Sequence, residues 1–249
     1  MADWKVFLLI SGPVTVNQIT KFQAQKGGIE SFLTDVSVTD ASHGVKIEIV
    51  AKADNQSDAN DAALYFVGQA LDYLCLKINL PLYVSLSGTQ IRPVDDNVRR
   101  IVHINDWQEC FREGRAIGIH RPTYSRALSW YRKAKNSEDP IDAFLSFWSA
   151  IEGVSSKFAR NTKRTKQGAI NQACDCFDQL WGGESSWKVI TNDASAVNNF
   201  YEKRNGIAHG ALRIDIDTVK SISSYIPRIS ALAYEFLKDW EQQGINPEP

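Results

Sequence analysis

The spacing of hydrophobic positions changes part-way along the chain. Before residue 90, short apolar runs are interrupted by polar residues, most regularly where Lys46 and Glu48 separate Val45, Ile47 and Ile49. Such alternation predicts a β-strand with one buried face. Strands are expected at residues 4–10, 29–39, 45–51, 82–86 and 98–104. The second and third of these are predicted to form a hairpin through residues 42–44.

Helical spacing occurs once in this region and then dominates after Pro122. Residues 62–78 carry apolar side chains three and four positions apart, which predicts one long amphipathic helix, with Ser57 or Asp58 as its cap. Asp106 is expected to cap a short helix that ends near Phe111. Gly114, Gly118 and Pro122 then indicate a junction between two domains.

After this junction the pattern predicts a bundle of about five helices. Asp139 followed by Pro140 is a typical helix start, and the helix after it is apolar on nearly all sides, so it is expected at the centre of the bundle. The other helices are expected at residues 124–135, 166–180, 193–209 and 218–243, the last kinked or restarted at Pro227. The fold class is therefore α+β: a small N-terminal antiparallel sheet with one long helix in domain 1–115, then an all-α bundle in domain 120–246.

Composition narrows the functional classes without choosing among them. The chain has 249 residues, a formal net charge of −1 and an ordinary hydrophobic content, as in a soluble globular protein. No apolar run approaches the roughly 18 residues of a membrane helix. The four cysteines lack zinc-site spacing, and free thiols in the cytoplasm are expected. No metal site and no cofactor is predicted.

Candidate chemistry is concentrated at the end of one predicted helix. Arg204 and Asn205 are followed by His209 and then by Gly210, a residue that commonly follows a helix end. Spacing alone is weak support, because Arg115 and His120 repeat it in a stretch that is expected to be a turn.

Arg204 also lies on the apolar stripe of its helix, and Glu152 interrupts the apolar helix in the same way. A charge on a buried stripe is costly unless it is paired, so we expect these two opposite charges to meet. The alternative is that Glu152 reaches the edge of the bundle and contacts nothing.

These residues resemble a known family, the HEPN domains, and in particular their ApeA-like branch. The resemblance rests on residues 144–152, where Trp148 precedes Glu152 by four positions, on the basic connection that follows, and on Arg204-Asn205, three residues, His209-Gly210. It covers the helical half of the chain; the N-terminal half resembles no family.

The resemblance implies a metal-independent ribonuclease that acts as a homodimer. His209 would move protons during attack of the ribose 2′-hydroxyl, because imidazole titrates near neutral pH. Arg204 would bind the phosphate, Asn205 would orient His209 or hydrogen-bond the phosphate, and Glu152 would support Arg204. The basic connection would hold the RNA backbone, although a solvated loop is an equal alternative: it contains Lys157, Arg160, Lys163, Arg164 and Lys166.

A second function stays open, a catalytically inactive interaction or dimerisation module whose N-terminal domain binds a partner or ligand. The near-neutral charge favours this alternative slightly, since nucleic-acid binders are often basic. The expected partners are RNA, a second copy of the chain and a regulatory protein, without a membrane. Two settings are common among HEPN proteins: defence against phage, and toxin–antitoxin systems. Ala211 stands where toxins modified by a nucleotidyltransferase carry a Tyr, so that arrangement is not expected.

Overall fold

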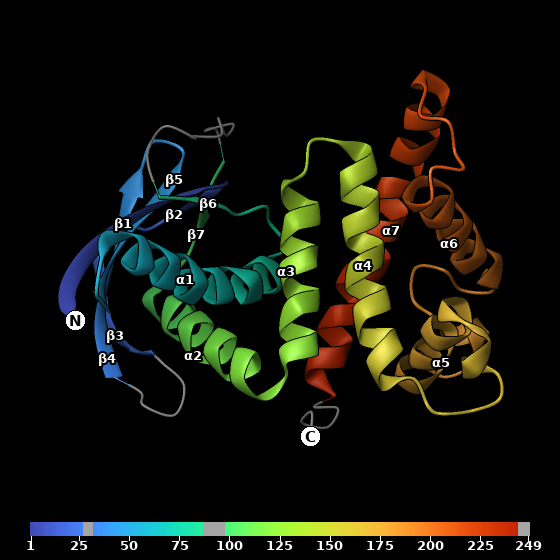
Figure 1. Cartoon of the computed structure of the whole chain (residues 1–249), viewed down its shortest axis with the longest axis horizontal. Helices are drawn as coiled ribbons and strands as arrows, with labels where there is room; N and C mark the ends of the chain where they lie inside the picture. Colours follow the sequence, from blue (N-terminus) through green and yellow to red (C-terminus); the bar gives the residue numbers. More distant parts are fainter. Residues whose placement is uncertain (27–31, 87–97, 244–249) are drawn as a thin grey trace. The chain divides into compact units, whose positions relative to one another are not determined.

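The computed structural model describes residues 1–26, 32–86 and 98–243, and the chain forms two compact units, residues 1–121 and 122–249. The first unit combines strands with helices and the second is helical (Figure 1), which confirms the predicted α+β class. No helix in the described ranges has both the length and the apolar character needed to cross a bilayer.

The first unit is built on a five-stranded antiparallel sheet with the strand order β3-β4-β5-β1-β6. β1 and β5 pair from Ala2 opposite Ala53 to Ser11 opposite Gly44. The hairpin between β4 and β5 is confirmed, with Ala41 opposite Gly44. A separate parallel pair joins β2 and β7. The strands are β1 (Ala2–Ser11), β2 (Val14–Thr15), β3 (Thr20–Lys26), β4 (Phe32–Ala41), β5 (Gly44–Ala53), β6 (Tyr83–Ser85) and β7 (Arg100–Ile101).

Two strand predictions need correction. β3 was not expected, because Phe22 and Ala24 are its only buried apolar residues and the apolar pattern is therefore short; the third buried residue, Thr20, is polar. The strand expected at 98–104 is reduced to Arg100–Ile101, since α2 already begins at Ile104. Residues 29–31 of the second expected strand lie outside the described residues.

Two helices, α1 (Gln56–Ile78) and α2 (Ile104–His120), lie on one side of the sheet (Figure 1) and contact β1, β3 and β5. The cap of α1 is Asn55, whose side chain accepts a hydrogen bond from the Asp58 backbone N–H, rather than Ser57 or Asp58. Asn55 therefore starts the helix at Gln56, ahead of residue 62 where the apolar pattern begins.

The predicted end of the second helix at Phe111 was wrong, because α2 continues through both glycines to His120. A Cβ atom on Gly114 would lie 2.4 Å from the Gln69 carbonyl oxygen of α1, and one on Gly118 would lie 2.1 Å from the Gln69 side chain. The glycines thus permit close contact between two helices. His120 belongs to this helix and not to the expected turn.

The second unit contains five helices in the described residues, as predicted, with α4 in contact with the other four (Figure 1). Asp139 caps α4 by accepting a hydrogen bond from the Ile141 N–H. α7 passes through Pro227 without restarting; Pro227 and Ser223, four residues earlier, are both exposed, so water can solvate the Ser223 carbonyl. The helices are α3 (Pro122–Asn136), α4 (Pro140–Phe158), α5 (Ala169–Trp181), α6 (Ala194–Ala208) and α7 (Ile216–Gln242).

Aromatic rings, most of them buried, fill the spaces between these helices. Phe144 of α4, Phe200 of α6 and Tyr225 of α7 form one cluster of edge-to-face contacts. Phe177 and Phe236 belong to a second cluster between α5 and α7. All four cysteines are free thiols, as predicted, and all four are buried. Burial raises the pKa of Cys176 to about 12, so this thiol is unreactive near neutral pH.

Candidate functional site

The candidate site is formed where α6 ends. Asp193 caps the start of α6 through the Ala196 N–H, and the helix ends at Ala208, followed by His209 and by Gly210 with a φ of +65°. Gly210 therefore has the left-handed conformation of a glycine after a helix, which confirms the predicted end of α6.

The chain after the helix folds back and fixes the position of His209. The His209 N–H donates to the Asn205 carbonyl, and the Leu212 N–H donates to the Gly206 carbonyl over 2.8 Å. A Cβ atom on Gly206 would lie 3.2 Å from Cβ of Leu212, so the glycine leaves room for this return. The backbone of His209 is thus held between the last turn of α6 and the returning segment.

Arg204 and Glu152 meet, as their positions on two apolar stripes predict. Arg204 Nη2 lies 3.2 Å from Glu152 Oε2, and Arg204 Nη1 donates to Asn205 Oδ1 over 2.9 Å. The side chains of Arg204 and Glu152 are 29% and 25% exposed. The alternative, in which Glu152 contacts nothing, was wrong.

Packing between α4 and α6 brings this pair together. Trp148 lies one turn before Glu152 on α4 and is fully buried, and its ring contacts that of Tyr201 on α6 at a centroid distance of 6.1 Å. Tyr201 in turn precedes Arg204 by three residues. One aromatic contact therefore places the carboxylate of α4 beside the guanidinium of α6.

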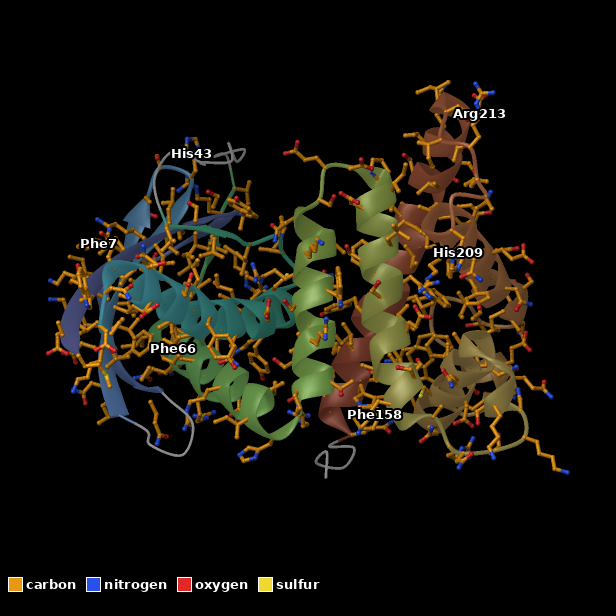
Figure 2. The ribbon with its side chains drawn as sticks, viewed as in Figure 1. Phe7, His43, Phe66, Phe158, His209 and Arg213 are labelled. Carbon is orange, nitrogen blue, oxygen red and sulfur yellow. The ribbon has the colours of Figure 1, made fainter. Side chains whose placement is uncertain are left out.

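The arrangement leaves part of Arg204 and all of His209 accessible. A guanidinium has five N–H groups, and those to Glu152 and Asn205 are the two that find acceptors among the described residues. His209 is exposed (Figure 2), and its imidazole has no hydrogen-bond partner in the described part of the chain. An anion bound here would meet free N–H donors and a solvent-open imidazole.

The basic connection divides into two kinds of residue. Arg160 donates to Asp175 Oδ1 through Nε at 2.9 Å and Nη2 at 2.6 Å, and Arg164 lies 3.6 Å from Asp178. The remaining members are exposed and have no partner among the described residues: Lys157, Lys163 and Lys166.

The structure does not bring this connection to His209. Figure 2 places Phe158, the last residue of α4, well apart from His209 within the same unit. The connection begins at Phe158, so it forms a separate feature. Arg213, which was not considered as a site residue, is exposed and also lies apart from His209 (Figure 2).

Sequence reasoning missed Asp175. Its carboxylate is buried and accepts hydrogen bonds from the Arg160 backbone N–H, the Arg160 side chain and Gln179. Burial alone would raise the pKa of Asp175, but the hydrogen bonds from Arg160 outweigh it and lower the pKa below its usual value. Asp175 shares its helix face with Asn171, Gln172, Asp178 and Gln179, so the search for a charge on an apolar stripe gave no signal for it. Among the described residues, no three His, Cys, Asp or Glu side chains form a group that could hold a metal ion.

Residues 127–225 match the family model of methylamine utilization protein MauJ. That family is HEPN-like, and the matched range includes Glu152, Arg204, Asn205 and His209. The match spans less than half of the chain. No curated protein and no solved structure matches the chain.

Proposed function

We propose that the protein is a metal-independent endoribonuclease of the HEPN type, of the ApeA-like branch, that acts as a homodimer. The observation that carries this proposal is the hydrogen-bonded series Glu152–Arg204–Asn205 beside an exposed His209 on one helix end. The match to a HEPN-like family over the same residues supports it.

The proposed reaction needs only groups that this chain supplies. Arg204 binds the non-bridging oxygens of the phosphate with its free N–H groups, while Glu152 and Asn205 hold the guanidinium plane in place. An imidazole takes the proton of the 2′-hydroxyl as its oxygen attacks phosphorus. The bond from phosphorus to the 5′-oxygen breaks, and that oxygen receives a proton from an imidazolium. The products are a 2′,3′-cyclic phosphate and a 5′-hydroxyl.

A homodimer supplies the second imidazole that this scheme uses. Ile214, in the connection between α6 and α7, and Ile216, the first residue of α7, are 52% and 65% exposed and follow His209 closely in sequence. Exposed apolar side chains on this segment favour its burial against a partner. Phage defence or a toxin system is the proposed biological setting, and a regulatory protein is the proposed further partner.

The test is RNA cleavage by purified protein in excess EDTA, with analysis of the new ends. We expect cleavage to leave 2′,3′-cyclic phosphates and to fall by about 10²–10⁴-fold in His209→Ala. Arg204→Ala should lose activity comparably. The matched controls are Arg213→Ala and His120→Ala, which remove exposed residues of the same types and should cleave normally.

The second candidate is an inactive interaction module whose N-terminal unit binds a partner. The near-neutral charge of the chain favours it. A folded dimer that cleaves none of several RNAs, and whose dimerisation weakens in Arg204→Ala, would support this second function over the first.

A further inference from the structure

The connection between α4 and α5 is held in one conformation by buried polar groups. Asp175 accepts the Arg160 backbone N–H at 2.8 Å as well as its side chain. Thr165 is buried; its hydroxyl accepts the Thr162 N–H, while the Thr162 hydroxyl accepts the Thr165 N–H. The segment is therefore an ordered loop, residues 159–168, although it contains no α-helix.

Within this ordered loop and at its start, three cations are not neutralised. Lys157, Lys163 and Lys166 are exposed, and no acid among the described residues pairs with them. The two arginines of the same stretch are already engaged with acids of α5. The lysines thus provide positive charge at fixed backbone positions and are free to take an external anion.

The loop and the candidate cleavage site lie apart. Figure 2 shows Phe158, next to Lys157, at a distance from His209 in the helical unit. A longer strand bound at His209 has more length to extend to the lysines than a short oligonucleotide has. Cleavage through a 2′-hydroxyl also requires a flexible strand, which favours single-stranded RNA.

We propose that Lys157, Lys163 and Lys166 form a phosphate-binding subsite for single-stranded RNA, remote from the cleavage site, which makes binding dependent on RNA length. This inference rests on the proposed function and extends it to the substrate. Arg160 and Arg164 build the loop, and the lysines bind the RNA backbone without sequence preference.

The test measures binding of fluorescent single-stranded RNA to full-length protein carrying His209→Ala, which prevents cleavage. RNAs of about 20 and about 4 nucleotides are compared over a range of salt concentrations. Replacing the three lysines by Gln should weaken binding of the long RNA at least tenfold. The slope of log K against log salt should decrease by about 2, since each lost contact to a single strand removes about 0.7. The short RNA should bind as before.

The control variant replaces Lys21, Lys46 and Lys220 by Gln, which removes the same charge from other exposed positions. An equal loss of affinity in this control, or none in the loop variant, would overturn the subsite. An equal loss for short RNA would overturn the length dependence. Vesicles with anionic lipid that bind through these lysines, when RNA binding does not need them, would overturn the assignment to RNA.

Cleavage is assayed separately in protein with His209 intact. Protein that binds RNA through the loop but never cleaves refutes the proposed nuclease and retains the subsite. Protein that cleaves and binds long RNA equally well without the lysines refutes the subsite alone.

Discussion

Arg160 and Arg204 of the helical unit each lie against a carboxylate, but they differ in the number of hydrogen bonds that they make to it. Arg160 directs Nε, Nη2 and its own backbone N–H to Asp175, whose side chain is only 8% exposed. Arg204 makes one hydrogen bond to Glu152, which is 25% exposed, and one to Asn205.

The difference shows how a structural arginine can be distinguished from one that can bind a ligand. The contacts of Arg160 tie the loop to α5, so their loss affects folding. Arg204 is oriented by two acceptors, Glu152 and Asn205, and its remaining N–H groups lie at a part-buried position where its side chain is 29% exposed. The guanidinium of Arg160 also keeps N–H groups free, but its side chain is 60% exposed and all its hydrogen bonds go to Asp175. Bidentate recognition of a phosphate requires a guanidinium that is held in one orientation and still has N–H groups without an acceptor.

The largest effect should come from replacing each arginine by lysine. In Arg204→Lys the charge remains but the planar fork is lost, so one ammonium cannot contact Glu152, Asn205 and a phosphate together. We expect kcat for RNA cleavage to fall by about 100-fold, while Arg160→Lys stays within about twofold of wild type. Equal losses in the two variants, measured under saturating RNA, would contradict the distinction.

The second effect concerns stability. Here the larger loss is expected at the Arg160–Asp175 pair and the smaller loss at the Arg204–Glu152 pair. Asp175→Asn weakens the contacts to Arg160 at a buried position, and we expect it to lower the free energy of unfolding by about 2 kcal/mol. Glu152→Gln breaks a half-exposed pair and should cost less than about 1 kcal/mol. Urea denaturation followed by circular dichroism gives both values, and a larger loss in Glu152→Gln would reverse the comparison.

The sequence predicted one of these pairs and missed the other for a physical reason. Glu152 and Arg204 stand out because each is a lone charge on a strongly apolar stripe. Asp175 lies on a polar face of α5 and does not stand out there, and Arg160 belongs to a basic run that is typical of a solvated loop. The run seemed to lack an acid only because its acids come from the following helix.

The prediction of helices and strands also depended on how strong the apolar pattern of each element is. The sheet hairpin and the central helix α4 follow from clear apolar periodicity and were predicted. β3 was missed because the apolar residues of its buried face are only Phe22 and Ala24. α2 was shortened because glycines favour breaks locally, whereas Gly114 and Gly118 serve contact with Gln69, which depends on tertiary packing.

A third, smaller effect would refine the role of Glu152. Glu152→Gln keeps a hydrogen-bond acceptor for Arg204 but removes the charge that holds the guanidinium. We expect about a tenfold decrease in kcat with little change in KM, because Glu152 positions Arg204 and does not contact RNA. Glu152→Asp, which keeps the charge but shortens the side chain, should recover part of the loss; a variant that raises KM alone would point to direct contact with the substrate.

The smallest effect is a pH dependence of the free energy of unfolding, which is expected for the Arg160–Asp175 pair. The pKa of Asp175 is lowered below its usual value of 3.8 because the hydrogen bonds from Arg160 outweigh the effect of burial. A depressed pKa in the folded state contributes stability above about pH 4 that is lost as pH falls through the folded pKa. The stability difference between wild type and Asp175→Asn should therefore shrink below about pH 4. The difference from Arg160→Gln should shrink over the same range, since that variant removes the same pair from the other side. Differences that stay constant from pH 7 to about pH 3 would show that Asp175 is not held ionised by Arg160.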